Sequence, residues 1–109
     1  MKDIYEKTLL FDFYGELLTE HQQEVYAAVV FEDMSLREAS DTFGISRQGI
    51  HDLIHRCDEI LKSYEEKLQL IAQFGRLKKS LARLKKDLEK EVPKEKLLEE
   101  IEKIRTEIG

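Results

Sequence analysis

The stretch from Ser35 to Arg56, SLREASDTFGISRQGIHDLIHR, constrains the fold of this chain more than any other. Ser35 and Glu38 have the spacing of a capping box, in which the serine oxygen accepts a backbone N–H and the glutamate reaches back to the capping residue. Gly44 suits the left-handed conformation that ends a helix. Ser46 suits the cap of the helix that follows. The stretch therefore predicts two helices joined by a tight turn, which is a helix-turn-helix.

Apolar residues at helical spacing indicate which faces of these two helices are buried. On the first helix we expect an inward face of Leu36, Ala39, Ser40 and Phe43, and on the second helix one of Ile50, Leu53 and Ile54. The opposite face of the second helix is then left for solvent, a partner or a DNA major groove.

Composition favours a helix-rich chain with one modest core. Of the 109 residues, 41% are hydrophobic and 38% are charged, and only one is proline. The apolar run Val25 to Phe31 is far shorter than the roughly 20 residues that span a bilayer, and the start MKDIYEK lacks a signal-peptide core. The single cysteine, Cys57, cannot form an internal disulfide. We therefore expect a cytoplasmic protein without a membrane segment.

Charge is distributed unevenly along the chain. Residues 1–75 contain 7 Lys or Arg and 15 Asp or Glu, a net charge of −8, whereas residues 76–109 contain 11 and 8, a net charge of +3. Neutralised phosphates supply most of the affinity for nucleic acid. The acidic part is therefore expected to bind duplex DNA weakly, unless dimerisation or the basic tail contributes.

Further helices are expected on both sides of the helix-turn-helix. Residues 3–17 form an amphipathic pattern, and Thr19 with Gln22 predicts a second capping box that starts a helix running to about Glu32. The helix after Ser46 has no breaker before Gly75, so we expect it to reach about Phe74.

A C-terminal antiparallel helical hairpin is predicted around Pro93, which breaks the helical pattern. Each arm has the four-three-four steps of a coiled-coil seam. The seam residues are Leu77, Leu81, Leu84 and Leu88, then Leu97, Ile101, Ile104 and Ile108. The sequence thus predicts an all-α protein with a core in residues 1–74, which includes the long fourth helix, and a hairpin extension in residues 75–109. Because this is more apolar surface than a chain of this length readily buries, we also expect a homodimer.

The run SRQGIHDLIHRCDEILKSYEEKL resembles the YlxM-like proteins, small bacterial helix-turn-helix proteins with a sigma-region-4-like turn. The resemblance extends upstream through FDFYGELLTEHQQEVYAAVVFEDMSLREASDTFGIS and covers about residues 4–74. It implies an accessory or regulatory role in the signal recognition particle pathway, with the particle's RNA or GTPase as partner. Gly49 departs from the family pattern, where alanine is commoner, and the lysine-rich tail from Arg76 carries little family signature.

A nucleic-acid surface, if present, would lie on the exposed face of the second helix. Arginine and glutamine suit guanine and adenine edges because their forked groups make two hydrogen bonds, the helix start offers N–H groups to a phosphate, and a glycine lets a backbone approach closely. The candidates are Ser46, Arg47, Gln48, Gly49, His51, Asp52, His55 and Arg56. The alternative is a solvated or protein-binding face. Because of Asp52 and the acidic balance, the sequence supports this alternative as well as it supports DNA reading.

Neither catalysis nor a cofactor is expected. His51 and His55 resemble the zinc-protease pattern H-E-x-x-H, but aspartate replaces glutamate and the sequence supplies no clear third ligand, so no metal is predicted. Cys57 lies on the apolar row of its helix and is expected to be a buried structural thiol.

A basic stripe precedes the hairpin turn and allows two interpretations. It consists of Arg76, Lys79, Arg83, Lys86 and Lys90. It could bind an anionic partner such as RNA or DNA phosphates. Alternatively, and more simply, it could pair with an acidic stripe of Glu95, Glu99 and Glu102 on the last helix.

Overall fold

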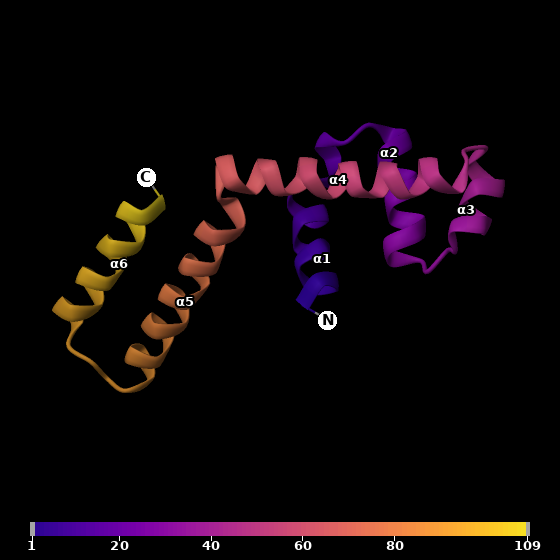
Figure 1. The fold of residues 1–109 in the computed structure, drawn as a ribbon. Coiled ribbons are helices and arrows are strands. Elements are labelled where there is room, and N and C mark those ends of the chain that lie inside the picture. The colour runs from indigo at the N-terminus through magenta and orange to yellow at the C-terminus, as the bar shows by residue number, and fades with distance from the viewer. Residues whose placement is uncertain (1, 109) are drawn as a thin grey trace. The chain divides into compact units, whose positions relative to one another are not determined.

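The computed structural model describes residues 2–108, which form helices and connecting turns without a strand. The all-α prediction is therefore confirmed. The elements in chain order are α1 (Lys2–Tyr14), the 3₁₀ helix η1 (Gly15–Leu17), α2 (Glu20–Tyr26), the π-helix η2 (Ala27–Phe31), α3 (Leu36–Phe43), α4 (Arg47–Leu68), α5 (Leu70–Glu89) and α6 (Lys94–Ile108) (Figure 1). Within the described residues, no helix is both long and apolar enough to cross a bilayer.

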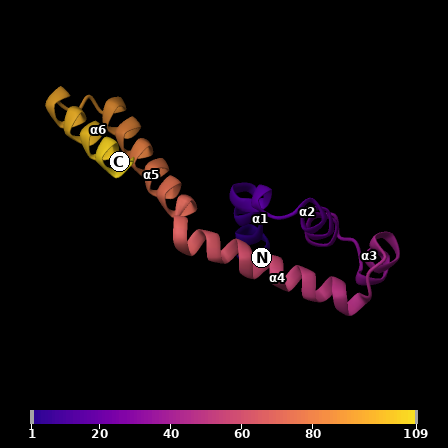
Figure 2. The ribbon, with the colours of Figure 1, turned by 90° about the horizontal axis from the view of Figure 1, so that it is seen from above.

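The chain divides into two compact units, one ending at Leu68 and the other beginning at Gln69. In the N-terminal unit, α4 is the central element, and α1, α2 and α3 all pack against it (Figure 2). Among the described residues, the buried hydrophobic side chains all belong to this unit. They are Leu10, Tyr14, Leu18, Val25, Tyr26, Ala28, Ala39, Ile50, Cys57 and Leu61.

Two buried tyrosines tie the N-terminal helices to α4 through their hydroxyl groups. Tyr14 donates to Glu65 Oε1 at 2.5 Å, and Tyr26 donates to Asp58 Oδ1 at 2.6 Å. Lys7 Nζ lies 3.3 Å from the other oxygen of Asp58. Burial, reinforced by the hydrogen bond to Asp58, raises the pKa of Tyr26 far above its ordinary value. The hydroxyl therefore stays protonated and remains a donor.

The helix-turn-helix is built as the sequence predicts. Both backbone-to-side-chain bonds of the capping box between Ser35 and Glu38 are formed, and Gly44 adopts the left-handed conformation with φ of 68°. Ser46 Oγ accepts from the backbone N–H of Gly49 at 3.0 Å. One residue differs from the expected inward face, because Leu36 is 39% exposed at the start of α3.

The second capping box, between Thr19 and Gln22, is also confirmed, and it starts α2. The predicted helix to about Glu32 continues, but as the π-helix η2 after Tyr26. There the N–H of Glu32 donates to Ala27 O at 3.1 Å, one residue wider than an α-turn.

The prediction that the long helix reaches Phe74 is wrong. The helix α4 ends at Leu68 because Gln69 adopts a left-handed conformation with φ of 53°. Gln69 is neither glycine nor asparagine, so the sequence carries no sign of a break there. Gly75, the expected breaker, lies inside α5.

The C-terminal unit is the predicted antiparallel hairpin of α5 and α6, but its seam has a different register. Leu77 and Leu84 are half-buried between the helices, as are Leu97 and Ile104. The other predicted seam residues, Leu81, Leu88, Ile101 and Ile108, are 47–67% exposed. Three polar residues take part in the half-buried rows instead: Ser80, Asp87 and Glu100.

Candidate functional site

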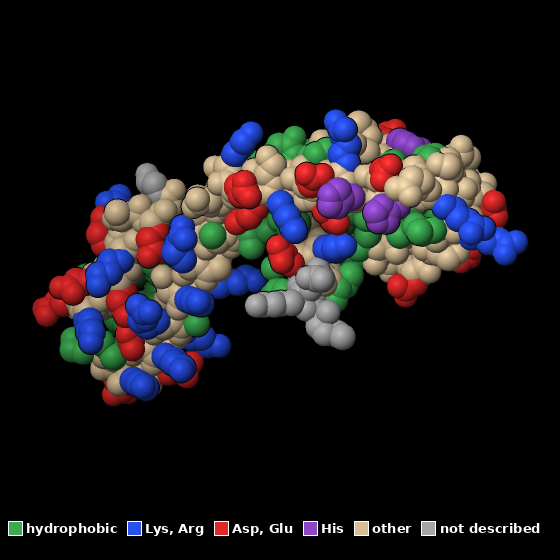
Figure 3. Space-filling view, in the orientation of Figure 1, with side chains coloured by type: hydrophobic (Ala, Val, Ile, Leu, Met, Phe, Trp, Pro, Cys, Tyr) green, Lys and Arg blue, Asp and Glu red, His purple; other side chains and the backbone are tan. Residues whose placement is uncertain are grey.

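The first turns of α4 present a polar face to solvent. Of the eight predicted residues, seven are exposed and Gly49 is half-buried. Basic, acidic and histidine side chains lie close together on the surface of the N-terminal unit (Figure 3). Helical spacing places Gln48, His51, Asp52, His55 and Arg56 on the side of α4 away from the packed row of Ile50, Leu53 and Ile54. Ser46 precedes the helix, and Arg47 and Gly49 lie at its start beside the packed row.

Asp52 lies at the centre of this face and engages two of its neighbours. Gln48 Nε2 donates to Asp52 Oδ1 at 2.9 Å, and His51 Nδ1 lies 3.6 Å from the same oxygen. These side chains are solvent-exposed, and exposed pairs contribute between about 0 and 1 kcal/mol. Gln48 can therefore be released to a partner at little cost, but Asp52 stays on the face as a negative charge.

His55 is paired in the same way, one helical turn further on. Its Nε2 lies 3.4 Å from Glu59 Oε1, four residues along the helix. Within residues 2–108, no group of three or more His, Cys, Asp or Glu side chains is arranged to hold a metal ion. The two histidines thus have individual carboxylate neighbours and no shared third ligand.

Gly49 serves the turn itself. A Cβ atom at this position would lie 2.6 Å from Ile45 Cγ2 and 3.1 Å from Ser46 Oγ. The space left by the missing side chain of Gly49 is therefore filled by Ile45 of the same chain, and it is not open to a nucleic-acid backbone. Ser46 is likewise occupied, because its hydroxyl caps α4.

An open depression borders this face, and the sequence did not indicate it. It is lined from the start of α2 by Thr19, His21 and Gln22, and from α4 by Gly49, Asp52, Leu53, His55, Arg56 and Glu59. His21 also makes an edge-to-face ring contact with Phe43 of α3 at 6.4 Å between centroids. No local motif marks His21, since its neighbours on α4 lie far away in sequence. The pairing of His55 with Glu59, by contrast, follows from their i, i+4 spacing.

The basic stripe of the hairpin is exposed along its whole length on α5. No ion pair within 4.0 Å joins the described residues of the basic stripe to Glu95, Glu99 or Glu102, and both interpretations of the stripe stay predictions. Glu102 instead pairs with Arg105 on its own helix. The five cationic side chains are thus exposed to solvent, and Arg83 also lies beside Glu100 of α6.

Comparison with known protein sequences identifies the family of this chain. Residues 1–103 match the family of helix-turn-helix proteins described as UPF0122, YlxM / p13 like. The chain belongs to this family. The match extends beyond residues 4–74, so the C-terminal hairpin shares in the family resemblance through most of its length.

Curated UPF0122 proteins from several bacteria are similar over most of the chain. The protein of Symbiobacterium thermophilum is 46% identical over 90 residues, which cover 83% of this chain and 84% of that protein. The protein of Halalkalibacterium halodurans is 39% identical over 105 residues, covering 93% and 96% respectively. The protein of Oceanobacillus iheyensis is 47% identical over 76 residues, covering 70% and 72%.

The thiol of this UPF0122 protein lies on the packed side of α4, as predicted. Cys57 is fully buried. Burial first, and the nearby Asp58 second, raise the pKa of Cys57 to about 11. A thiol with so high a pKa is almost entirely protonated near neutral pH and is a poor nucleophile. The exposed polar side chains of α4 therefore lie on the side of the helix opposite Cys57.

Proposed function

We propose that this UPF0122 protein is a non-enzymatic accessory or regulatory protein that acts in the cytoplasm by contact with another macromolecule. Its contact surface is the exposed face of α4. One observation carries the proposal: polar and charged side chains share this face, and weak pairs hold Gln48, His51 and His55 beside carboxylates while no partner is bound. Such groups can exchange these internal pairs for bonds to a partner at small cost.

Charge favours a protein over duplex DNA as that partner. The unit that contains α4 has a net charge of −8, and Asp52 stands in the middle of the face. In a major groove this carboxylate would lie close to phosphates and to base acceptors, and only the amino groups of cytosine and adenine could donate to it. The family resemblance points to the signal recognition particle pathway, so its RNA and its GTPase are the partners to test.

The test is a titration of the full chain with the particle's GTPase, its RNA and duplex DNA at two salt concentrations. We expect the GTPase or the RNA to bind, and Arg56→Ala to weaken binding by about tenfold or more, as loss of a contact-surface arginine does. The matched control is Lys62→Ala, which removes the same charge further along α4. If neither partner binds, or if both variants lose affinity equally, the proposal is contradicted.

A second function is supported by the start of α4. Arg47 and Gln48 are exposed at the end of the helix that a helix-turn-helix inserts into DNA. If the protein is instead a DNA-binding transcriptional regulator, duplex affinity falls steeply with added salt, because phosphate contacts release counterions. In that case Gln48→Ala relaxes sequence preference more than it reduces affinity for random DNA. A duplex affinity that is insensitive to both changes excludes this function.

A further inference from the structure

The hairpin of α5 and α6 has no enclosed core of its own. None of the described residues of α5 or α6 is fully buried. Its half-buried rows include the polar residues Ser80, Asp87 and Glu100 beside the leucines. The two helices therefore cover each other only in part, and much of their aliphatic surface is left in solvent.

The uncovered aliphatic residues lie on one side of the hairpin. Leu81 and Leu88 each follow one residue after the half-buried Ser80 and Asp87, and Ile101 follows one residue after Glu100. One residue turns a helix by about 100° in a fixed sense. Because the two helices run antiparallel, the same sense of rotation brings both exposed rows to the same side. That side carries Leu81, Leu88, Leu98, Ile101 and Ile108, which are 47–67% exposed; we call it the aliphatic face.

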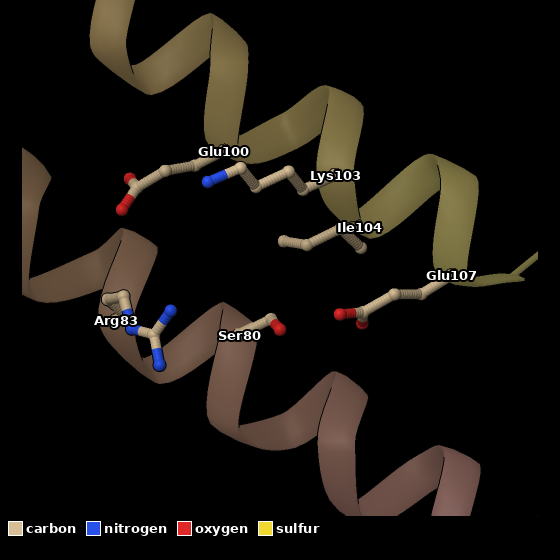
Figure 4. Close-up of a pocket in the computed structure, with 6 residues that line it drawn as sticks. All are labelled: Ser80, Arg83, Glu100, Lys103, Ile104 and Glu107. Carbon is tan, nitrogen blue, oxygen red and sulfur yellow. The ribbon is translucent and has the colours of Figure 1, made fainter.

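The opposite side of the hairpin is polar. A small pocket there is lined by Ser80 and Arg83 of α5 and by Glu100, Lys103, Ile104 and Glu107 of α6 (Figure 4). The basic stripe that contains Arg83 also lies away from the aliphatic face. The hairpin is thus amphipathic as a unit, with one side suited to water and one side suited to a hydrophobic partner.

We infer that the aliphatic face is the interface of a homodimer, in which the hairpins of two copies pack into a four-helix bundle. Two identical faces of this kind are self-complementary, as a twofold interface requires. Pairing them encloses ten aliphatic side chains and supplies the core that one hairpin lacks. The inference is independent of the function proposed for α4, since it concerns the other unit of the chain.

Charge sets the orientation of the two hairpins. The helix α5 has six basic and two acidic residues, whereas α6 has four and five. Lys78 and Lys85 border the leucines of α5, whereas on α6 Glu102 and Arg105 neutralise each other beside Ile101. Packing α5 on its own copy would bring like charges together. Each α5 therefore lies against α6 of the partner subunit, and the basic stripe stays exposed in the dimer.

The first experiment measures the mass of the full chain by analytical ultracentrifugation from about 1 to about 100 μM, the range of micromolar affinities. We expect a dimer that Leu81→Glu weakens by at least about tenfold, because a charge is forced into an apolar interface. Leu17→Glu is the matched control, since Leu17 is 55% exposed in the other unit. A monomer at every concentration, or a dimer equally stable in both variants, would overturn the inference.

A second experiment tests the orientation without disrupting the hairpin. Leu81→Cys and Ile101→Cys copies of different tag length are oxidised separately and as a mixture. The inferred packing predicts a disulfide mainly between the two different copies in the mixture. Equal or stronger crosslinking within Leu81→Cys alone would overturn the orientation, and no crosslinking in any sample would overturn the interface.

Discussion

At the scale of single residues, buried polar atoms decide how the N-terminal unit is held together. The hydroxyls of Tyr14 and Tyr26 donate to carboxylates on α4. Because both tyrosines are buried, water does not reach these hydroxyls to replace a lost carboxylate partner. A buried hydroxyl without a partner costs free energy comparable to a lost hydrogen bond. Asp58 is shared between Tyr26 and Lys7, so one carboxylate ties both α1 and α2 to α4.

Tyr26→Phe is expected to lower the free energy of unfolding by about 1.5–3 kcal/mol, the contribution of a hydrogen bond to a charged group. Urea denaturation followed by circular dichroism measures the change. The control is Tyr5→Phe, because Tyr5 is 69% exposed and has no hydrogen bond among those described. Equal effects of the two substitutions would show that the bond to Asp58 does not stabilise the fold.

Neither tyrosine bond could be predicted from the sequence. Tyr14 and Glu65 are separated by 51 positions, and Tyr26 and Asp58 by 32. Both partners are common surface residues, and only the packing of α1 and α2 on α4 brings them together. The roles of Ser35, Gly44 and Thr19 were predictable because each depends on neighbours within a few residues.

At the scale of elements, the caps determine where the helix-turn-helix begins. Ser35→Ala removes the oxygen that accepts the N–H of Glu38, and it is expected to destabilise the N-terminal unit by about 1 kcal/mol. Thermal unfolding measures the effect. Thr42→Ala on the same helix is the control, since Thr42 is exposed and its substitution leaves the cap intact. A loss no larger than that of Thr42→Ala would contradict the role of the cap.

The register of the hairpin shows why a periodic pattern is not enough. Leu77, Leu81, Leu84 and Leu88 have ideal seam spacing, yet the helices meet along a row rotated toward Ser80 and Asp87. The pattern indicates which stripe is apolar. This stripe is wide enough both to pack against the other helix of the hairpin and to form the aliphatic face. Which part of it faces α6 depends on the three-dimensional path of the turn after Glu89, where Glu91 adopts a φ of 57°.

The carboxyl pair of Asp87 and Glu100 makes the hairpin sensitive to pH. Interaction with the carboxyl group of Asp87, then burial, raises the pKa of Glu100, while Lys96 and Arg83 lower it. A raised pKa in the folded state means that the protonated pair stabilises the hairpin at acidic pH. This contribution is lost as the pH rises through the folded-state pKa.

Glu100→Gln is therefore expected to stabilise the hairpin relative to the parent chain at neutral pH, since an amide donates without titrating. The advantage should shrink as the pH falls toward the ordinary range of a glutamate carboxyl. Thermal melts of both chains across this range measure it. Glu99→Gln is the control, because Glu99 is exposed on the same helix. A pH-independent difference, or the same trend in the control, would rule out the carboxyl pair as its cause.

At the scale of the whole molecule, burial is concentrated in one unit. Every fully buried hydrophobic side chain among the described residues lies before Gln69. The expected boundary after residue 74 rested on Gly75, whereas the units divide between Leu68 and Gln69. A left-handed conformation at a glutamine carries no sequence signal, so this division was not predictable.

A chain truncated after Leu68 is expected to fold by itself, because it keeps the enclosed core and the helix-turn-helix. Its thermal unfolding should be cooperative and independent of protein concentration. The full chain should show an additional concentration dependence if its hairpins associate. Calorimetry at two concentrations measures both. A truncated chain without a cooperative transition would mean that the N-terminal unit requires the hairpin.

The tyrosine–carboxylate bonds also make the intrinsic tyrosine fluorescence of the protein sensitive to unfolding. The chain contains four tyrosines and no tryptophan, so its near-ultraviolet emission comes from tyrosine alone. A carboxylate that accepts a phenol proton quenches tyrosine fluorescence, and two of the four rings are held in such bonds. Unfolding of the N-terminal unit should therefore brighten the emission, and the helix-turn-helix can be monitored without attaching a dye.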